Sequence, residues 1–283
     1  MSLSILSDIP ALAAQSALNT NQTNMQNTLV QLSTGQRINS GADDPAGLAI
    51  ANGLQVNISA LTQSQQNVND GIGQLQVVDG ALGQVTDLLN TAVTLATEAS
   101  NGTENSSQLQ ALNDQFTSIK TEIDNIGSNT NFNGANVFTA STTSIFLSDA
   151  GSSYTIGMSP GTLSSANIAP GSGATGMTAV DLSGDNLLTN GAAQTALTAI
   201  NSAVANVANN RGAVGATINQ MQAATNVVSA QVQNLTAAES GIMDANIPSV
   251  VNNLSQEQTL AQTGMSALSS AIQSQQLVLK LLG

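Results

Sequence analysis

Apolar residues recur at alternating spacings of three and four residues along much of this chain, and this spacing predicts long amphipathic helices. The most regular run extends from Leu197 to Leu235. Its positions are Leu197, Ile200, Val204, Val207, Arg211, Val214, Ile218, Met221, Thr225, Val228, Val232 and Leu235. Such a heptad seam is typical of a long helix that packs lengthwise against other helices.

Two further runs keep this alternation, a short one from Leu109 to Ile126 and a looser one from Leu61 to Ala96. None of the three segments could bury its apolar stripe alone. We therefore predict a mainly α fold, an elongated antiparallel helical bundle or coiled coil, with paired terminal helices and a small β-hairpin region.

Both ends of the chain carry apolar residues at helical spacing, although termini are usually polar and frayed. We expect these stripes to be buried against each other or against other copies of the chain. The positions at which we expect subunit assembly contacts are Leu18, Met25, Leu29, Leu32, Leu254, Met265, Leu268, Ile272, Leu279 and Leu282. Burial of the same side chains within one folded subunit is the alternative, and the sequence leaves it open.

The region between residues 139 and 186 contrasts with the helical runs because it is rich in Gly, Ser and Thr. The stretch TSIFLSDAGSSYTIGM, residues 143–158, has two short β-prone runs joined by a Gly-Ser turn and predicts a hairpin. The following stretch PGTLSSANIAPGSGATG, residues 160–176, is typical of a loop. We expect the whole region to be a surface excursion between helices.

The stretch LSTGQRINSGADDPAGLAIA, residues 32–51, is typical of a linker between two helices. Gly35 can end the first helix because glycine adopts positive φ at low cost. Asp44 followed by Pro45 favours a new helix start, since Asp accepts bonds from free N–H groups and Pro fits the first turn. Arg37 either pairs with Asp43 or Asp44 to fix the linker or remains a solvated charge.

Composition excludes several classes of function. The chain has no Cys and no His, so disulfides, thiolate nucleophiles, histidine bases and ordinary zinc sites are ruled out, and we expect neither an enzyme nor a cofactor or metal. Only 4 Lys and Arg residues are present against 17 Asp and Glu, and they are far apart, so we expect no nucleic-acid binding. The N-terminus lacks a secretory signal pattern and no apolar run is long enough to span a membrane.

The linker stretch resembles the N-terminal signature of bacterial flagellins, in which a helix ends at S-[ST]-G, R-I-N-S follows, and D-D-[AP]-A-G-x-A-I-A begins the next helix. The similarity continues in NVNDGIGQLQVVDGAL, residues 67–82, and in NTNFNGANVF, residues 129–138. The C-terminal stretch from residue 237 to residue 283 is also similar. The motifs follow one another in the order that the family has.

The resemblance implies a short flagellin without large outer domains. In flagellins the terminal segments are disordered in the free monomer and become paired helices at the core of a helical filament used for swimming. We expect a terminal-helix core domain at 1–36 and 245–283, a linker at 37–57, a bundle domain at 58–138 and 187–244, and a short variable region at 139–186. Localisation in the extracellular flagellar filament, export without a cleaved signal peptide, and an export chaperone, junction proteins and cap proteins as partners follow by resemblance.

Many flagellins are recognised by a Toll-like receptor through the helical motif L-Q-R-V-R-E-L. The corresponding residues here lie between Leu89 and Leu95, and the charged positions of the motif are Thr91, Val93 and Thr94. Since Arg and Glu supply charge-assisted hydrogen bonds, we predict weak or absent receptor activation.

Two alternatives to a filament subunit remain. The first is a hook–filament junction protein of the same superfamily, and the second is a non-flagellar surface coiled-coil protein or adhesin. Some flagellins carry a metallopeptidase in the middle region, but its H-E-x-x-H helix requires histidine, which this chain lacks.

Overall fold

The computed structural model describes residues 9–139, 143–148, 155–158, 160–169 and 178–282. Its helices are α1 (Ile9–Thr34), α2 (Pro45–Ala99), α3 (Ser106–Asn129), α4 (Asn190–Met243) and α5 (Ile247–Leu282). The chain forms two compact units. Unit 1 comprises Met1–Asn57 and Gln233–Gly283, and unit 2 comprises Ile58–Val232. The prediction of a mainly α fold is confirmed.

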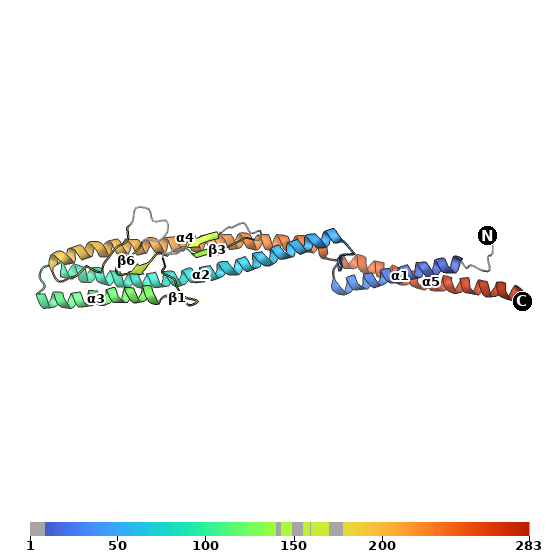
Figure 1. Ribbon diagram of the computed structural model, residues 1–283, viewed down its shortest axis with the longest axis horizontal. Helices are drawn as coiled ribbons and strands as arrows, with labels where there is room; N and C mark the ends of the chain where they lie inside the picture. Colours follow the sequence, from blue (N-terminus) through green and yellow to red (C-terminus); the bar gives the residue numbers. More distant parts are fainter. Residues whose placement is uncertain (1–8, 140–142, 149–154, 159, 170–177, 283) are drawn as a thin grey trace. The chain divides into compact units, whose positions relative to one another are not determined.

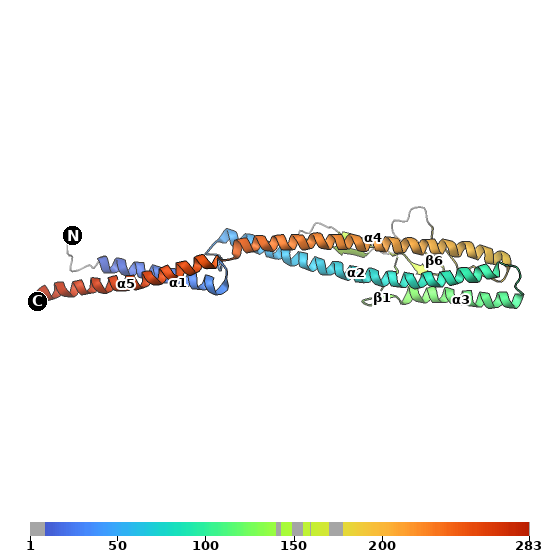
Figure 2. The same cartoon turned by 180° about the vertical axis from the view of Figure 1, so that it is seen from behind.

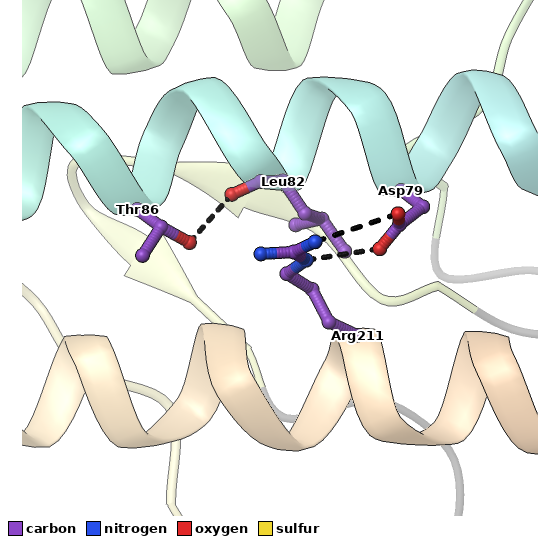
Figure 3. Close-up of polar contacts among 4 residues, drawn as sticks. All are labelled: Asp79, Leu82, Thr86 and Arg211. Carbon is purple, nitrogen blue, oxygen red and sulfur yellow. Dashed lines mark hydrogen bonds and ion pairs between the residues drawn. The ribbon is translucent and has the colours of Figure 1, made fainter.

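Unit 2 is a helical bundle in which α3 and parts of α2 and α4 lie side by side (Figures 1 and 2). Side-chain contacts set the directions of its long helices: Gln65 donates to Ser229 Oγ at 3.0 Å, and Arg211 Nε donates to Asp79 Oδ1 at 2.9 Å. Residue numbers therefore rise along α2 as they fall along α4, so the two helices are antiparallel. Figure 3 shows the Arg211–Asp79 pair, which is partly exposed and contributes about 0–1 kcal/mol.

The core of unit 2 follows the three predicted apolar runs. Phe116 of α3 is fully buried and is the largest side chain to be so. The other fully buried large side chains of these helices are Leu61, Leu75, Leu82, Leu89, Ile123, Ile200 and Met221. Arg211 occupies a position of the predicted seam but turns to Asp79, because its guanidinium needs a charged partner and access to water.

The strands of the described residues form three separate antiparallel pairs. The predicted hairpin is confirmed as β3 (Thr143–Phe146) paired with β4 (Thr155–Met158). A second hairpin joins β1 (Asn131–Phe132) to β2 (Ala135–Asn136) through Asn133 and Gly134, whose φ angles of 50° and 78° are typical of a tight type I′ turn. The third pair is β5 (Leu163–Ser164) and β6 (Asn167–Ile168).

The β5–β6 pair corrects the expectation of a loop at 160–176, of which residues 170–176 lie outside the described part. Its backbone packs directly on α3, because a Cβ added at Gly127 would lie 1.9 Å from the carbonyl oxygen of Leu163. Asn206 of α4 also donates to Ile168 O at 3.0 Å and to Thr178 O at 2.9 Å.

The middle region is also more than a surface excursion. Its buried apolar side chains are Leu147, Ile156, Leu163, Ile168 and Leu182. Lys120 of α3 donates to Asp185 O at 2.8 Å and lies 4.9 Å from the ring centroid of Phe116. Short strands and loops therefore complete the core of unit 2 instead of lying on its surface.

Unit 1 contains the paired terminal helices, and Figure 1 shows α1 alongside α5. The bridge between Gln36 and Asp244 lies at one end of the pair, and Leu18 contacts Gly264 farther along, where its Cδ1 is 3.5 Å from the position of a Cβ. Numbers fall along α1 as they rise along α5, so the terminal helices are antiparallel. Unit 1 has few buried apolar side chains, among them Ile38, Ala51 and Val250.

Candidate functional site

The predicted assembly positions divide into two groups in unit 1. Five of them are half-buried at the spacing of the side on which α1 and α5 pack, namely Leu18, Met25, Leu32, Leu254 and Leu268. Among them Leu18 contacts Gly264 of α5, which is the kind of contact within one chain that the sequence left open as the alternative. Leu29, Met265 and Ile272 are instead 46%, 56% and 44% exposed. The side chains of Leu279 and Leu282 lie outside the described residues.

Exposed large apolar side chains gather in unit 1. They are Ile9, Leu12, Leu29, Val30, Ile50, Val56, Ile247, Val251, Leu260, Met265 and Ile272. In the described part of unit 2 the exposed ones are Val77, Phe146, Leu188 and Val227. Ile50 and Val56 lie on α2, and the other nine lie on α1 and α5. Isolated exposed apolar residues are normal, but nine on one pair of helices indicate an interaction surface.

The exposed residues lie on both flanks of the packed side of α5. Leu254, Ala261 and Leu268 repeat every seven residues and mark the packed side. At about 100° per residue, Leu260 and Met265 project about 140° apart, one on each flank of this seam. Leu260 is not among the predicted positions, because heptad spacing marks the packed stripe and not its flanks.

A polar cluster interrupts the interface between α1 and α5. The Thr28 hydroxyl donates to Glu257 Oε1 at 3.1 Å, and Asn21 donates to the backbone carbonyl of Glu257 at 2.8 Å. Glu257 Oε2 is buried and has no hydrogen-bond partner among the described residues. Since an unpaired buried polar atom costs free energy, this oxygen lowers the stability that the pair would otherwise have.

The linker between α1 and α2 is held by its own carboxylates. Gly35 ends α1 with φ of 72°, and Asp44 Oδ1 accepts from Gly47 N at 2.9 Å at the start of α2. Asp43 Oδ2 accepts from the backbone N–H groups of Asn39 and Ser40 at 3.0 and 2.8 Å. These bonds, with one from the Ser40 hydroxyl, lower the pKa of Asp43 below its ordinary value of 3.8.

Arg37 does not pair with Asp43 or Asp44, so the first of the two alternatives for this residue does not hold. Its guanidinium donates to the carbonyl of Ile242 at 2.8 Å, while Asp43 is already engaged by backbone N–H groups. Among the described residues, an ion pair with a nitrogen–oxygen distance within 4.0 Å is formed by Arg211 and Asp79. Arg37 is exposed, so its guanidinium stays in contact with water, as the second alternative expects, while it also donates to the backbone carbonyl of Ile242.

The two connections of unit 1 form a short backbone ladder. Arg37 N donates to Met243 O at 2.6 Å, and Ala245 N donates to Gly35 O at 2.9 Å. Gln36 and Asp244 lie opposite each other between these bonds. The ladder joins the end of α1 to the connection between α4 and α5, although about 200 residues of sequence separate them.

Comparison with known proteins assigns the family. A model of the bacterial flagellin N-terminal helical region matches residues 5–143, and one of the C-terminal helical region matches residues 197–282. Together they cover most of the chain. It belongs to the bacterial flagellin family. A flagellin of Serratia marcescens is 41% identical over 130 residues, which are 46% of this chain and 37% of that protein. This flagellin chain thus spans well under half the length of that curated relative.

Two solved structures are also similar to this chain. A Bacillus cereus flagellin is 29% identical, with a TM-score of 0.48 over 62% of this chain and 94% of that one. A protein described as a flagellar hook-associated protein of Vibrio parahaemolyticus is 15% identical, with a TM-score of 0.57 over 71% of this chain and 100% of that one. The second likeness concerns the fold alone.

The receptor-motif positions of this flagellin lie in the bundle of unit 2. Leu89 is fully buried, Leu95 nearly so and Val93 half-buried, whereas Thr91 and Thr94 are exposed. The Thr91 hydroxyl donates to Asp87 O at 3.0 Å, and that of Thr94 donates to Thr91 O at 2.7 Å. The exposed positions therefore carry short hydroxyls already bonded to their own helix.

Neither a metal site nor a membrane span is present in the parts of the flagellin chain that the structure describes. No group of three acidic side chains there could hold a metal ion. Its helices also lack the length and apolar character that a membrane crossing requires. The candidate site is the surface of the α1–α5 pair, where most of the exposed large apolar side chains lie.

Proposed function

We propose that this flagellin is a structural subunit that self-assembles through unit 1 into the helical filament of the bacterial flagellum, outside the cell, where the filament serves swimming. The observation that carries the proposal is the concentration of exposed apolar side chains on the paired terminal helices. Burial of such surface stabilises association by about 25 cal/mol per Å² of apolar area.

The position of these residues on both flanks of α5 favours a polymer over a closed oligomer. A closed dimer needs one self-complementary face. Two different faces allow each subunit to bind one neighbour with one flank and another neighbour with the other. Repetition of such a heterologous contact produces an open helical assembly when the rotation does not close.

The α1–α5 pair is suited to ordering during assembly. Isolated helices gain little stability in water, and fixing a residue costs about 1–2 kcal/mol of conformational entropy. The half-buried seam and the unpaired Glu257 oxygen give this pair less internal stabilisation than a full core would. Contacts with neighbouring copies of the chain would supply the rest of the stabilisation that the α1–α5 pair needs to stay ordered.

We further propose the domain organisation expected from the sequence. Residues 1–36 and 245–283 would form the filament core, and 58–138 with 187–244 would form the surrounding bundle. Residues 37–57 would act as the linker and 139–186 as the short variable region. Export without a cleaved signal and binding of a chaperone, junction proteins and cap proteins belong to the same proposal.

The alternatives have less support. The likeness to the hook-associated protein extends to the fold but is only 15% identical, whereas both flagellin family models match this sequence. A non-flagellar surface coiled coil or adhesin would not account for matches to both family models. An enzymatic role has no support, since flagellins are structural proteins.

Electron microscopy of seeded polymerisation tests the proposal. Purified chain is incubated with short filament seeds beside a variant that lacks Ile272 to Gly283. Long uniform filaments are expected from the intact chain only, with both proteins folded by circular dichroism. Failure of the intact chain to form filaments, or normal filaments from the truncated one, would contradict it.

A further inference from the structure

The ladder between the two connections is closed by one side chain. Residues 35–37 leave α1, and residues 242–245 join α4 to α5. Two backbone hydrogen bonds link these segments, from Arg37 N to Met243 O and from Ala245 N to Gly35 O. The Arg37 guanidinium adds a third link to the carbonyl of Ile242 at 2.8 Å.

The C-terminus of α4 has backbone carbonyls that lack partners within the helix, and Arg37 donates to one of them. The last carbonyls of a helix lack partners within the helix and carry partial negative charge. The last turn of α4 contains no basic residue of its own. Arg37 lies far away in the sequence but supplies a positive charge and hydrogen-bond donors at this point. It therefore caps the C-terminus of α4 from another part of the same chain.

We infer that Arg37 is a positioning residue for assembly, which closes a clasp of residues 35–37 and 242–245 so that α1 and α5 order as a pair. This inference rests on the proposed function. With the clasp closed, the end of α1 is held beside the start of α5. Pairing of the two helices then closes only a short loop. Its entropic cost is lower than the cost of closing a loop of about 200 residues.

The geometry favours arginine over lysine at this position. Its main-chain N–H and its guanidinium bind the carbonyls of Met243 and Ile242, which are consecutive along α4. The planar guanidinium presents several donors in a fixed arrangement, while a lysine ammonium is a single, strongly hydrated charge. A lysine here should therefore restore the clasp only in part.

The test compares Arg37→Gln and Arg37→Lys with Arg211→Gln in the full chain. Arg211 is a matched control because Arg211→Gln removes the same charge, together with an exposed ion pair in unit 2. The critical concentration for seeded polymerisation is measured, with hydrogen exchange of α1 amides in the filaments. We expect Arg37→Gln to raise the critical concentration about tenfold, Arg37→Lys less, and Arg211→Gln under about twofold.

An engineered disulfide provides a rescue. Gln36 and Asp244 form the pair that is not hydrogen-bonded in the ladder, and the Cα atoms of such a pair are about 4.5 Å apart, within the range of disulfides. The chain has no other cysteine. Gln36→Cys with Asp244→Cys, added to Arg37→Gln, should restore the critical concentration when oxidised and not when reduced.

The outcomes separate this inference from the proposed function. If the unchanged chain forms no filaments, the proposed function fails. If it does, but Arg37→Gln behaves like Arg211→Gln, or the oxidised disulfide restores nothing, the clasp is overturned. Faster exchange of α1 amides in Arg37→Gln filaments, reversed by oxidation, supports it.

Discussion

The two units of this flagellin use apolar residues in opposite ways. In unit 2 every second position of the α4 seam from Ile200 to Val228 is buried, as are most apolar positions of α2 and Phe116 of α3, and short strands complete the core. In unit 1 the seam of α1 and α5 is only half-buried, and large apolar side chains such as Leu260 and Met265 remain exposed. Similar sequence periodicity thus produces a finished core in one unit and an incomplete one in the other.

The two units differ in the number of neighbouring helices that pack against each apolar stripe. A helix in a bundle meets two neighbours, so a broad stripe is covered. In unit 1, α1 and α5 have mainly each other, so the flanks of each stripe are left in water. Unit 2 is therefore expected to be stable in the monomer, whereas in the proposed function unit 1 is stabilised by contacts with other copies of the chain.

The largest effect is expected from the core of unit 2. Phe116→Ala removes its largest fully buried side chain and should lower the free energy of unfolding by about 3–5 kcal/mol. Denaturant unfolding followed by circular dichroism measures this loss. Met25→Ala in the half-buried seam of unit 1 should cost much less in the same assay. Equal losses would break the comparison.

Exposed residues of unit 1 should affect assembly without affecting folding. Met265→Gln is expected to raise the critical concentration about tenfold while changing the unfolding free energy by less than about 0.5 kcal/mol. Val227→Gln is the matched control, since Val227 is 59% exposed on unit 2 and Met265 is 56% exposed on unit 1. An equal effect of both substitutions would show that the surface of unit 1 is not distinct.

The buried carboxylate between α1 and α5 should set their register. Glu257→Leu removes the unpaired Oε2 and is expected to stabilise the pair by about 1 kcal/mol while permitting slipped pairings. A short thiol crosslinker reports the register in assembled chains. Leu18→Cys with Gly264→Cys should react in the native register, and Leu18→Cys with Ala271→Cys only after a slip of one heptad. No gain of the second product with Glu257→Leu would argue against a register role.

The linker should respond to acid. The folded pKa of Asp43 lies below its ordinary value of 3.8, so its bonds to Asn39 and Ser40 contribute stability above that value and are lost as pH falls through the lower folded pKa. The amide proton shift of Ser40, followed by NMR, should titrate below pH 3.8. In Asp43→Ala this titration should disappear. A transition above 3.8 would contradict the assignment.

The smallest effect is expected for receptor activation, which depends on the receptor-motif positions. Thr91, Val93 and Thr94 offer no charged partner, and Leu89 and Leu95 are buried in the bundle. Reporter cells carrying the Toll-like receptor should respond weakly or not at all to this chain. A response equal to that of a flagellin with the charged motif would refute the prediction.

The sequence predicts what local periodicity encodes. The seam from Leu197 to Leu235 and the hairpin at 143–158 follow from spacing and turn composition, which depend on nearby residues. The β5–β6 pair was missed because strands of two residues have no period to detect. They form because Asn206 and the missing side chain at Gly127 give the backbone a place on the helices.

The contact of Arg37 was missed for a different reason. In the sequence, Asp43 and Asp44 are the nearest acidic partners. The carboxylate of Asp43, however, already accepts hydrogen bonds from the N–H groups of Asn39 and Ser40. The actual partner, Ile242, lies 205 positions away. The exposed flanks of α5 were also hidden, since Leu260 and Leu268 look alike in a list of apolar positions. Leu268 continues the seven-residue repeat of the packed side and Leu260 does not, but this distinction needs the packed side to be known first.

The ladder at residues 35–37 and 243–245 also bears on how chains of this family can differ in length. The chain leaves the terminal pair and returns to it at adjacent points. Anything encoded between these points is, topologically, an insertion whose two ends are already together. Residues can be gained or lost in that insertion without moving α1 relative to α5. Longer relatives can therefore keep the same terminal pair while the inserted part diverges.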